Sequence, residues 1–61
     1  MIDWIECSVS VPPNDQAVLT KIDDEHGPRN EQVLRLVGRL WWFEDMSMYV
    51  YYAPTHWRPL T

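Results

Sequence analysis

The sequence predicts a mainly β fold: a small single antiparallel sheet of three to four strands in a meander, with extended amino- and carboxy-terminal arms packed over it. Two observations favour this fold class. Short segments rich in β-branched and aromatic residues alternate with clusters of Pro, Gly and Asp, as strands alternate with turns. Four Trp, three Tyr and one Phe supply large apolar side chains to a chain of 61 residues, a length that admits one core. We therefore expect residues 1–61 to form a single domain.

Both ends of the chain are expected to be extended arms. Residues 3–11 alternate loosely in polarity, and the Pro12-Pro13 pair that follows lacks two backbone donors and predicts a turn or loop. Residues 55–61 follow Pro54, which ends regular strand pairing because it has no amide hydrogen. The side chains expected to anchor the arms on the core are Trp4, Ile5, Trp57 and Leu60.

Two segments between the arms have strand character. Residues 16–22 place Val18, Thr20 and Ile22 on one face, and residues 48–53 are β-branched and aromatic. Residues 23–30 combine three consecutive acids with Gly27-Pro28, a composition that predicts a loop. The expected order is therefore a strand, a long loop, a central segment and a further strand.

The central segment, residues 31–43, leaves a hairpin, one long strand and a helix open. One apolar set follows helical spacing: Val33, Leu36, Val37 and Leu40. A second set follows one side of a strand: Leu34, Leu36, Gly38, Leu40 and Trp42. Gly38 would weaken a helix interior by about 1 kcal/mol, and the aromatic run after it favours β-structure. A turn at residues 37–39 would pair residues 31–36 with residues 40–43.

A strand here leaves aromatic and basic side chains on a second face. If the leucines and Trp42 cover the core, alternation puts Trp41 and Phe43 on the opposite face with the arginines. Three or four strands without a helix cannot cover both faces, and exposed Trp, Tyr and Arg are typical of protein-binding hot spots. The residues expected to bind a partner are Trp41, Arg35, Arg39 and Tyr49. The alternative is that the two arms fold over this face and bury it.

Acidic residues outnumber basic residues by nine to five, which gives a net charge of −4. This sign opposes direct binding of nucleic acid. Five acidic residues form two clusters in the expected turns: Asp23, Asp24, Glu25, Glu44 and Asp45. They are either solvated loop residues or a surface that imitates nucleic-acid phosphates and attracts a basic partner.

The compartment and the chemistry are constrained by the same composition. Cys7 is the one cysteine in the sequence, so no intrachain disulfide forms and a reducing cytoplasm is expected. The amino terminus has no signal-peptide pattern, and no stretch approaches the roughly 20 apolar residues that span a bilayer, so neither export nor a membrane is expected.

No residue pattern predicts a catalytic site. Cys7, His26 and His56 are the candidate nucleophile and bases, but nucleophilic catalysis also needs an orienting group and an oxyanion site, which the sequence does not supply. Cys7 is interpreted as a small half-buried hydrophobe. His56 is either a proton carrier or ligand, or a ring whose hydrogen bond to backbone fixes the tail. We expect no enzyme, no cofactor and no metal.

A pattern spread over the whole chain points to a family. Trp4-Ile5 opens it, Val11-Pro12 and Val18-Leu19 follow, and Thr55-His56-Trp57-Arg58-Pro59-Leu60 closes it. With these residues, and with Trp41-Trp42 before an acidic turn, the chain resembles the small phage and prophage family known as domain of unknown function 551. The closing hexapeptide is the most specific part. The middle of the chain departs from the family pattern. The Gly-rich turns of the family are largely missing from it, and residues 23–30 have no counterpart in the family.

The resemblance implies a phage or prophage accessory protein in the cytoplasm of a bacterial host cell, and it implies no activity. Together with the expected aromatic and arginine surface, it predicts a non-enzymatic protein that binds a host or phage protein, or a second copy of itself. The alternative is an acidic inhibitor that occupies the nucleic-acid site of a host defence or transcription enzyme.

Overall fold

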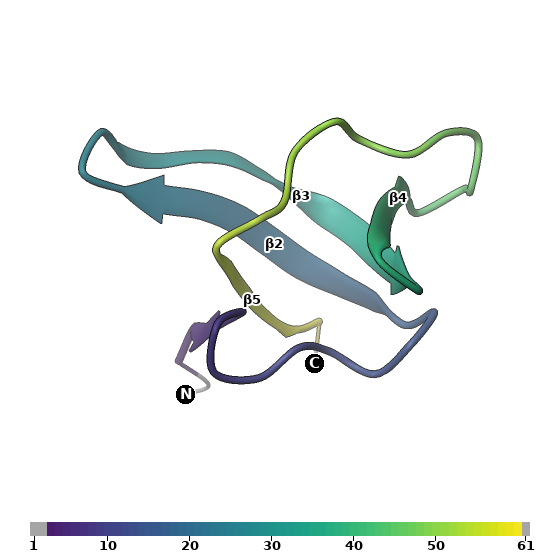
Figure 1. The fold of residues 1–61 in the computed structure, drawn as a ribbon, viewed down its shortest axis with the longest axis horizontal. Helices are drawn as coiled ribbons and strands as arrows, with labels where there is room; N and C mark the ends of the chain where they lie inside the picture. Colours follow the sequence, from purple (N-terminus) through teal and green to yellow (C-terminus); the bar gives the residue numbers. More distant parts are fainter. Residues whose placement is uncertain (1–2, 61) are drawn as a thin grey trace.

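The computed structural model describes residues 3–60, which form one open antiparallel sheet (Figure 1). The strands in chain order are β1 (Ile5–Glu6), β2 (Ala17–Asp24), β3 (Gly27–Val37), β4 (Leu40–Phe43) and β5 (His56–Pro59). Across the sheet their order is β1-β5-β2-β3-β4. The predicted fold class, mainly β with a single antiparallel sheet, is confirmed.

The two expected arms supply the additional strands. β5 lies between β1 and β2, with Trp57 opposite Ile5 on one side and opposite Thr20 on the other. An extended arm that lies beside a strand satisfies its backbone donors and acceptors by joining the ladder, which packing over the sheet would not achieve. The sheet therefore has five strands where three or four were expected, and its last strand lies in the interior.

The prediction of a loop at residues 23–30 was wrong, because β2 continues to Asp24 and β3 begins at Gly27. Only Glu25 and His26 lie between the two strands, so they form a two-residue turn. Gly27 follows them with a φ of +91°, which lets the chain complete the turn. The His26 amide donates to Asp24 Oδ1 at 2.9 Å, an Asx-type contact that stabilises the turn. Pro28 is tolerated in β3 because β4 does not extend alongside this part of the strand.

Residues 31–43 form a hairpin, not a helix, and the predicted turn at residues 37–39 is confirmed. Val37 lies opposite Leu40, so Gly38 and Arg39 make a two-residue turn. Gly38 has a φ of +64° at the first turn position, the place where type II′ turns require glycine. This conformation is easy for glycine and strained for other residues.

The expected assignment of faces in this hairpin was wrong for its second strand. Across a two-residue turn, paired residues have numbers of opposite parity: Leu34 faces Phe43, and Leu36 faces Trp41. Directly opposed residues lie on the same face of a sheet. Trp41 and Phe43 therefore join Leu34 and Leu36 on the core face, and Trp42 lies on the opposite face.

The strand predicted at residues 48–53 is not present. Tyr49 makes an isolated bridge to Trp42, and the Val50 amide donates to the Trp41 carbonyl at 2.8 Å. Beyond this contact the chain leaves the edge of β4, because it must pass across the sheet to place β5 beside β2 (Figure 1).

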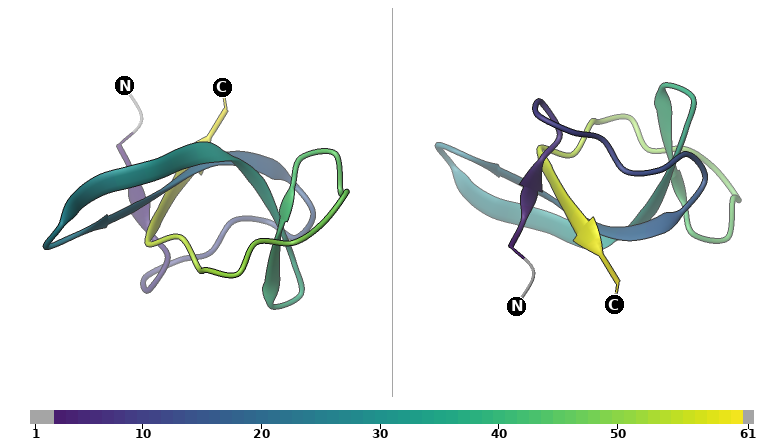
Figure 2. Two further views of the ribbon diagram at one scale, coloured as in Figure 1. Left: turned by 90° about the horizontal axis from the view of Figure 1, so that it is seen from above. Right: turned by 90° about the horizontal axis from the view of Figure 1, so that it is seen from below.

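The core lies between the sheet and its two long connections. Residues 7–16 and 44–55 lie on the same side of the sheet in both views of Figure 2. The core cluster consists of Val18, Leu34, Trp41 and Trp57, whose side chains are buried. Thr20 is fully buried beside them, and its hydroxyl donates to the Gln32 carbonyl at 2.8 Å. The predicted inward position of Trp57 is confirmed, whereas Leu60 is exposed, contrary to expectation.

The opposite face of the sheet carries Trp4. Ile5 packs against the core as predicted, but Trp4 packs on two cations instead. Its ring lies 4.5 Å from Lys21 Nζ and 5.2 Å from Arg58 Cζ. Cation–π attraction of this kind stabilises by about 0.5–1 kcal/mol at exposed sites, so Trp4 ties the amino terminus to β2 and β5.

Candidate functional site

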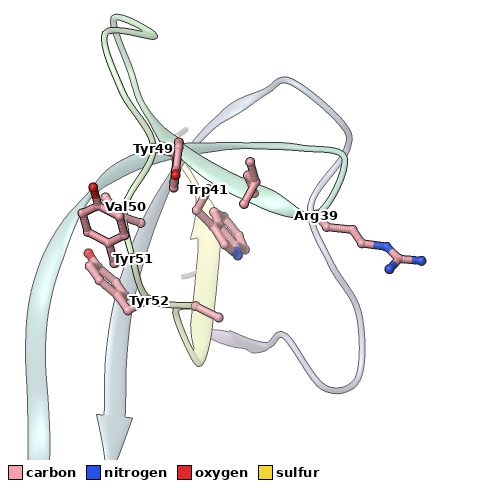
Figure 3. A pocket seen from close by; sticks show the side chains of 8 residues that line it. Arg39, Trp41, Tyr49, Val50, Tyr51 and Tyr52 are labelled. Carbon is pink, nitrogen blue, oxygen red and sulfur yellow. The ribbon is translucent and has the colours of Figure 1, made fainter.

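A shallow groove has two walls (Figure 3). The β3–β4 turn and β4 form the first wall, and the segment that begins at Tyr49 forms the second. Its volume is about 330 Å³. We call it the tyrosine groove, and its lining residues are Arg39, Leu40, Trp41, Tyr49, Val50, Tyr51, Tyr52 and Ala53. Val50 holds the second wall against β4 through its hydrogen bond to Trp41, so the groove belongs to the folded core region and not to a free loop.

Three of the four residues expected to bind a partner line this groove: Trp41, Arg39 and Tyr49. The expectation that Trp41 is an exposed anchor was wrong, because its side chain is only 6% exposed. It belongs to the core face opposite Leu36, and its remaining surface contributes to the groove. Tyr49 is 38% exposed and Arg39 is exposed.

Tyr51 is the residue that the sequence did not single out. It is 86% exposed, the largest exposure among the large hydrophobic side chains of residues 3–60. Its ring packs edge-to-face on Tyr49 with 5.5 Å between centroids, and Tyr49 packs in the same way on Trp42 at 5.6 Å. The signal was present in the aromatic run after residue 48, but the expected strand would have distributed these rings over two faces.

Arg35, the fourth expected binding residue, lies apart from the groove. Its guanidinium donates to the Asp15 carbonyl at 3.1 Å and to the Glu44 carbonyl at 3.1 Å. These bonds tie the loop before β2 to the loop after β4. Arg35 is thus engaged in holding two connections together, while Arg39 stands in the turn with no ion-pair partner among residues 3–60.

The two acidic clusters lie at opposite ends of the molecule, which is 29 Å along its longest axis (Figure 1). At the β2–β3 turn, Asp23 pairs with Lys21 at 3.0 Å and Asp24 pairs with Arg29 at 2.8 Å, while Glu25 is exposed. The hydrogen bond from Arg29 lowers the pKa of Asp24 to about 2.

The other cluster follows β4. Glu44 and Asp45 are exposed, and the Ser47 amide donates to Asp45 Oδ1 at 2.9 Å. This bond lowers the pKa of Asp45 because it stabilises the carboxylate. Neither cluster extends into the other, so the five carboxylates do not form one surface.

The residues that line a second groove, of about 370 Å³, include Cys7, Thr55 and His56. Cys7 packs partly against the core, and burial raises the pKa of its thiol. The His56 ring shares a hydrogen bond with Thr55 Oγ1 at 2.8 Å, so a side chain and not the expected backbone group fixes it. His26 lies at the β2–β3 turn beside Glu25. The three candidate catalytic residues are therefore not gathered in one place.

Residues 3–61 match the family described as "Protein of unknown function (DUF551)". The chain belongs to this family. In this DUF551 chain the closing hexapeptide contributes to the fold through two hydrogen bonds. Thr55 Oγ1 accepts one from the Asp23 amide at 2.7 Å, and Trp57 Nε1 donates one to the Ser10 carbonyl at 2.8 Å. No curated protein and no solved structure matches the chain significantly. Within residues 3–60 there is no helix of the length and apolarity needed to cross a membrane.

Proposed function

We propose that this chain is a non-enzymatic accessory protein that binds another protein through the tyrosine groove. The observation that carries the proposal is the set of exposed apolar and aromatic side chains, Leu40, Tyr49 and Tyr51, that lines the groove together with the exposed Arg39. Tyr and Arg are enriched in the residues that dominate binding energy at protein interfaces.

Tyr51 contributes little to folding through burial, since it is 86% exposed. Its position is nevertheless defined, because Tyr51 packs on Tyr49 and Tyr49 is bridged to Trp42 in β4. Aromatic side chains that are already ordered lose little entropy when a partner binds. An exposed ring held in place in this way favours a binding role over a structural one.

Two observations weigh against the rival functions. The raised pKa of Cys7 keeps its thiol protonated and weakly nucleophilic at neutral pH, which disfavours an enzyme that uses it. The separation of the acidic clusters, with Asp23 and Asp24 in ion pairs, disfavours an acidic inhibitor that imitates a phosphate backbone. Imitation requires a continuous array of unpaired charges.

The sequence resemblance supports a phage or prophage origin, and the lone Cys7 supports the bacterial cytoplasm as the compartment. The partner is then a host or phage protein. A second copy of the chain is the competing occupant of the groove. Light scattering coupled to size-exclusion chromatography tests for this self-association directly.

Affinity capture from bacterial lysate tests the proposal. The wild-type chain should retain a partner in high salt, because exposed charges are screened within about 3 Å at 1 M salt whereas apolar contacts are not. Tyr51→Ala should lose the partner, and Val9→Ala, an exposed apolar change outside the groove, should keep it. The proposal would be overturned in favour of the acidic inhibitor if the Tyr51→Ala variant still captured the partner and the chain lost it when four acidic side chains were neutralised, Asp24, Glu25, Glu44 and Asp45.

A further inference from the structure

The indole N–H of Trp41 is an unused donor in the tyrosine groove. Trp57 donates its Nε1–H to the Ser10 carbonyl, but Trp41 Nε1 makes no hydrogen bond to any of residues 3–60. Among those residues, no buried side-chain nitrogen or oxygen lacks a partner. Trp41 Nε1 must therefore reach the surface, and the surface that Trp41 lines is the groove. Figure 3 shows this nitrogen on the side of the ring toward Arg39.

The aromatic wall of the groove presents ring faces at steep angles to one another. The planes of Tyr49 and Tyr51 meet at 71°. Leu40 adds exposed apolar surface to the lining of the groove. Angled aromatic faces around a shallow open groove suit short, rigid, flat apolar groups better than a long flexible side chain.

We propose that the tyrosine groove binds a proline-rich segment of the partner protein in the polyproline II conformation, with a carboxylate of that segment on Arg39. This conformation has no internal hydrogen bonds, so its carbonyl groups are free to accept from Trp41 Nε1. Proline rings pack in aromatic-lined grooves, and the preformed helix loses little entropy on binding.

Charge complementarity selects an acidic segment. Lys21, Arg29 and Arg35 are paired with carboxylates, and Arg58 packs on Trp4. Arg39 is exposed and has no carboxylate partner among residues 3–60. A guanidinium and a carboxylate form charge-assisted hydrogen bonds, so Arg39 would fix the direction in which the segment lies.

The chain's own proline pair does not fill the groove of a second copy. Pro12-Pro13-Asn14-Asp15 has the required chemistry, but Pro12 is buried in the folded domain. Asp15 is held by Arg35, and the Asn14 side chain accepts from the Gly38 amide at 3.0 Å. The segment therefore belongs to another protein.

The inference rests on the proposed function and is tested with a defined probe. The probe is a short acetylated proline-rich peptide ending in two glutamates, titrated into the isotope-labelled chain and followed by two-dimensional NMR. The Trp41 indole signal and the amide signals of residues 49–53 should shift together. A matched peptide with alanine for proline should bind at least about tenfold more weakly, and one ending in two lysines about fivefold more weakly.

Three variants locate the contacts. Tyr51→Ala, at a residue that is mostly exposed, should weaken the peptide about tenfold and leave the rest of the spectrum unchanged. Trp41→Phe, which keeps an aromatic ring and removes the donor, should weaken it about fivefold to tenfold. Val9→Ala is the control and should bind as the wild type does.

Equal binding of the alanine peptide, shifts confined to residues outside the groove, or no shift at millimolar peptide would each overturn the inference. So would groove signals that shift with protein concentration alone, since a second copy would then be the occupant. If Tyr51→Ala abolishes capture of a lysate partner while the proline peptide does not bind, the proposed function stands and only the polyproline assignment fails.

Discussion

Leu36 of β3 lies directly opposite Trp41 of β4, and this pairing places both side chains on the core face of the sheet. The pair is fixed by the two-residue turn at Gly38 and Arg39. A shift of one residue in this register would move Trp41 to the open face and remove its ring from the core. The position of the turn therefore decides which of the two adjacent tryptophans is buried.

Substitution of Gly38 tests the turn. Gly38→Ala should destabilise the chain by about 1–2 kcal/mol, because a residue with a Cβ is strained at a φ of +64°. Overlap with other parts of the structure is not the cause, since an added Cβ would meet no atom within 4 Å outside Gly38 and its two chain neighbours. Urea denaturation measures the difference. Gly38→Asn is the matched control and should cost less, because Asn tolerates positive φ; an equal cost would contradict the explanation from backbone strain.

Truncation of Leu34 tests the core. Leu34 is fully buried opposite Val18, and Leu34→Ala should cost about 2–5 kcal/mol. Stability of roughly 0.05–0.15 kcal/mol per residue gives this chain only about 3–9 kcal/mol in total, so the variant should be largely unfolded or close to it. Thermal unfolding followed by circular dichroism measures the change. Val9→Ala, at an exposed side chain, should stay near the wild-type midpoint.

Replacement of Trp4 tests the cation–π anchor of the amino terminus. Trp4→Leu should destabilise by about 1–2 kcal/mol, because Lys21 and Arg58 lose the ring that both contact. A double-mutant cycle with Lys21→Met isolates the contribution of the first cation. A coupling energy of zero in the cycle would show that Trp4 acts through apolar contact alone.

The Asp24–Arg29 pair predicts acid sensitivity. The pKa of Asp24 in the folded chain is about 2, below the value near 4 of an unfolded chain. Its contribution to stability should therefore be complete above about pH 4 and be lost as the pH falls to about 2. The measurement is the urea midpoint as a function of pH for the wild type and Asp24→Asn, whose difference should shrink over this window. Arg29→Gln should raise the Asp24 pKa, as carbon-detected NMR titration would show.

The thiol of Cys7 should react slowly with alkylating reagents in the folded chain. Burial raises its pKa, so the reactive thiolate is scarce at neutral pH. Mass spectrometry after treatment with iodoacetamide should show modification at a rate well below that of the urea-unfolded chain. Rapid alkylation of the folded chain would reveal an activated thiol and reopen the possibility of catalysis.

The sequence predicted the parts of the fold that depend on local preference. The alternation around Val18 and Thr20 gave β2, and Gly38 before an aromatic run gave the β3–β4 hairpin. The arms were expected over the sheet, whereas Ile5–Glu6 and His56–Pro59 are strands within it. This pairing depends on a contact between Ile5 and Trp57, far apart along the chain, which no local pattern encodes.

The candidate site was predicted less well, for two physical reasons. Alternation was carried through a two-residue turn, and this reversed the faces of Trp41 and Trp42. The segment around Tyr51 was expected in a strand because of its β propensity, whereas its path is set by the need to reach β5. Arg39 and Tyr49, two of the residues expected to bind a partner, line the groove because a turn arginine and a ring beside the edge strand are exposed in either arrangement.

The central position of β5 determines when the sheet is completed during synthesis. β1 is the first strand to leave the ribosome, and it has no neighbour until β5 emerges after all the others. The β2–β3–β4 hairpins are joined by short turns and can pair as they are made, but the core keeps a gap where Trp57 belongs. Nascent chains in which His56 has not yet left the ribosome should therefore stay sensitive to proteases. Protection should appear in one step once Pro59 has emerged from the ribosome.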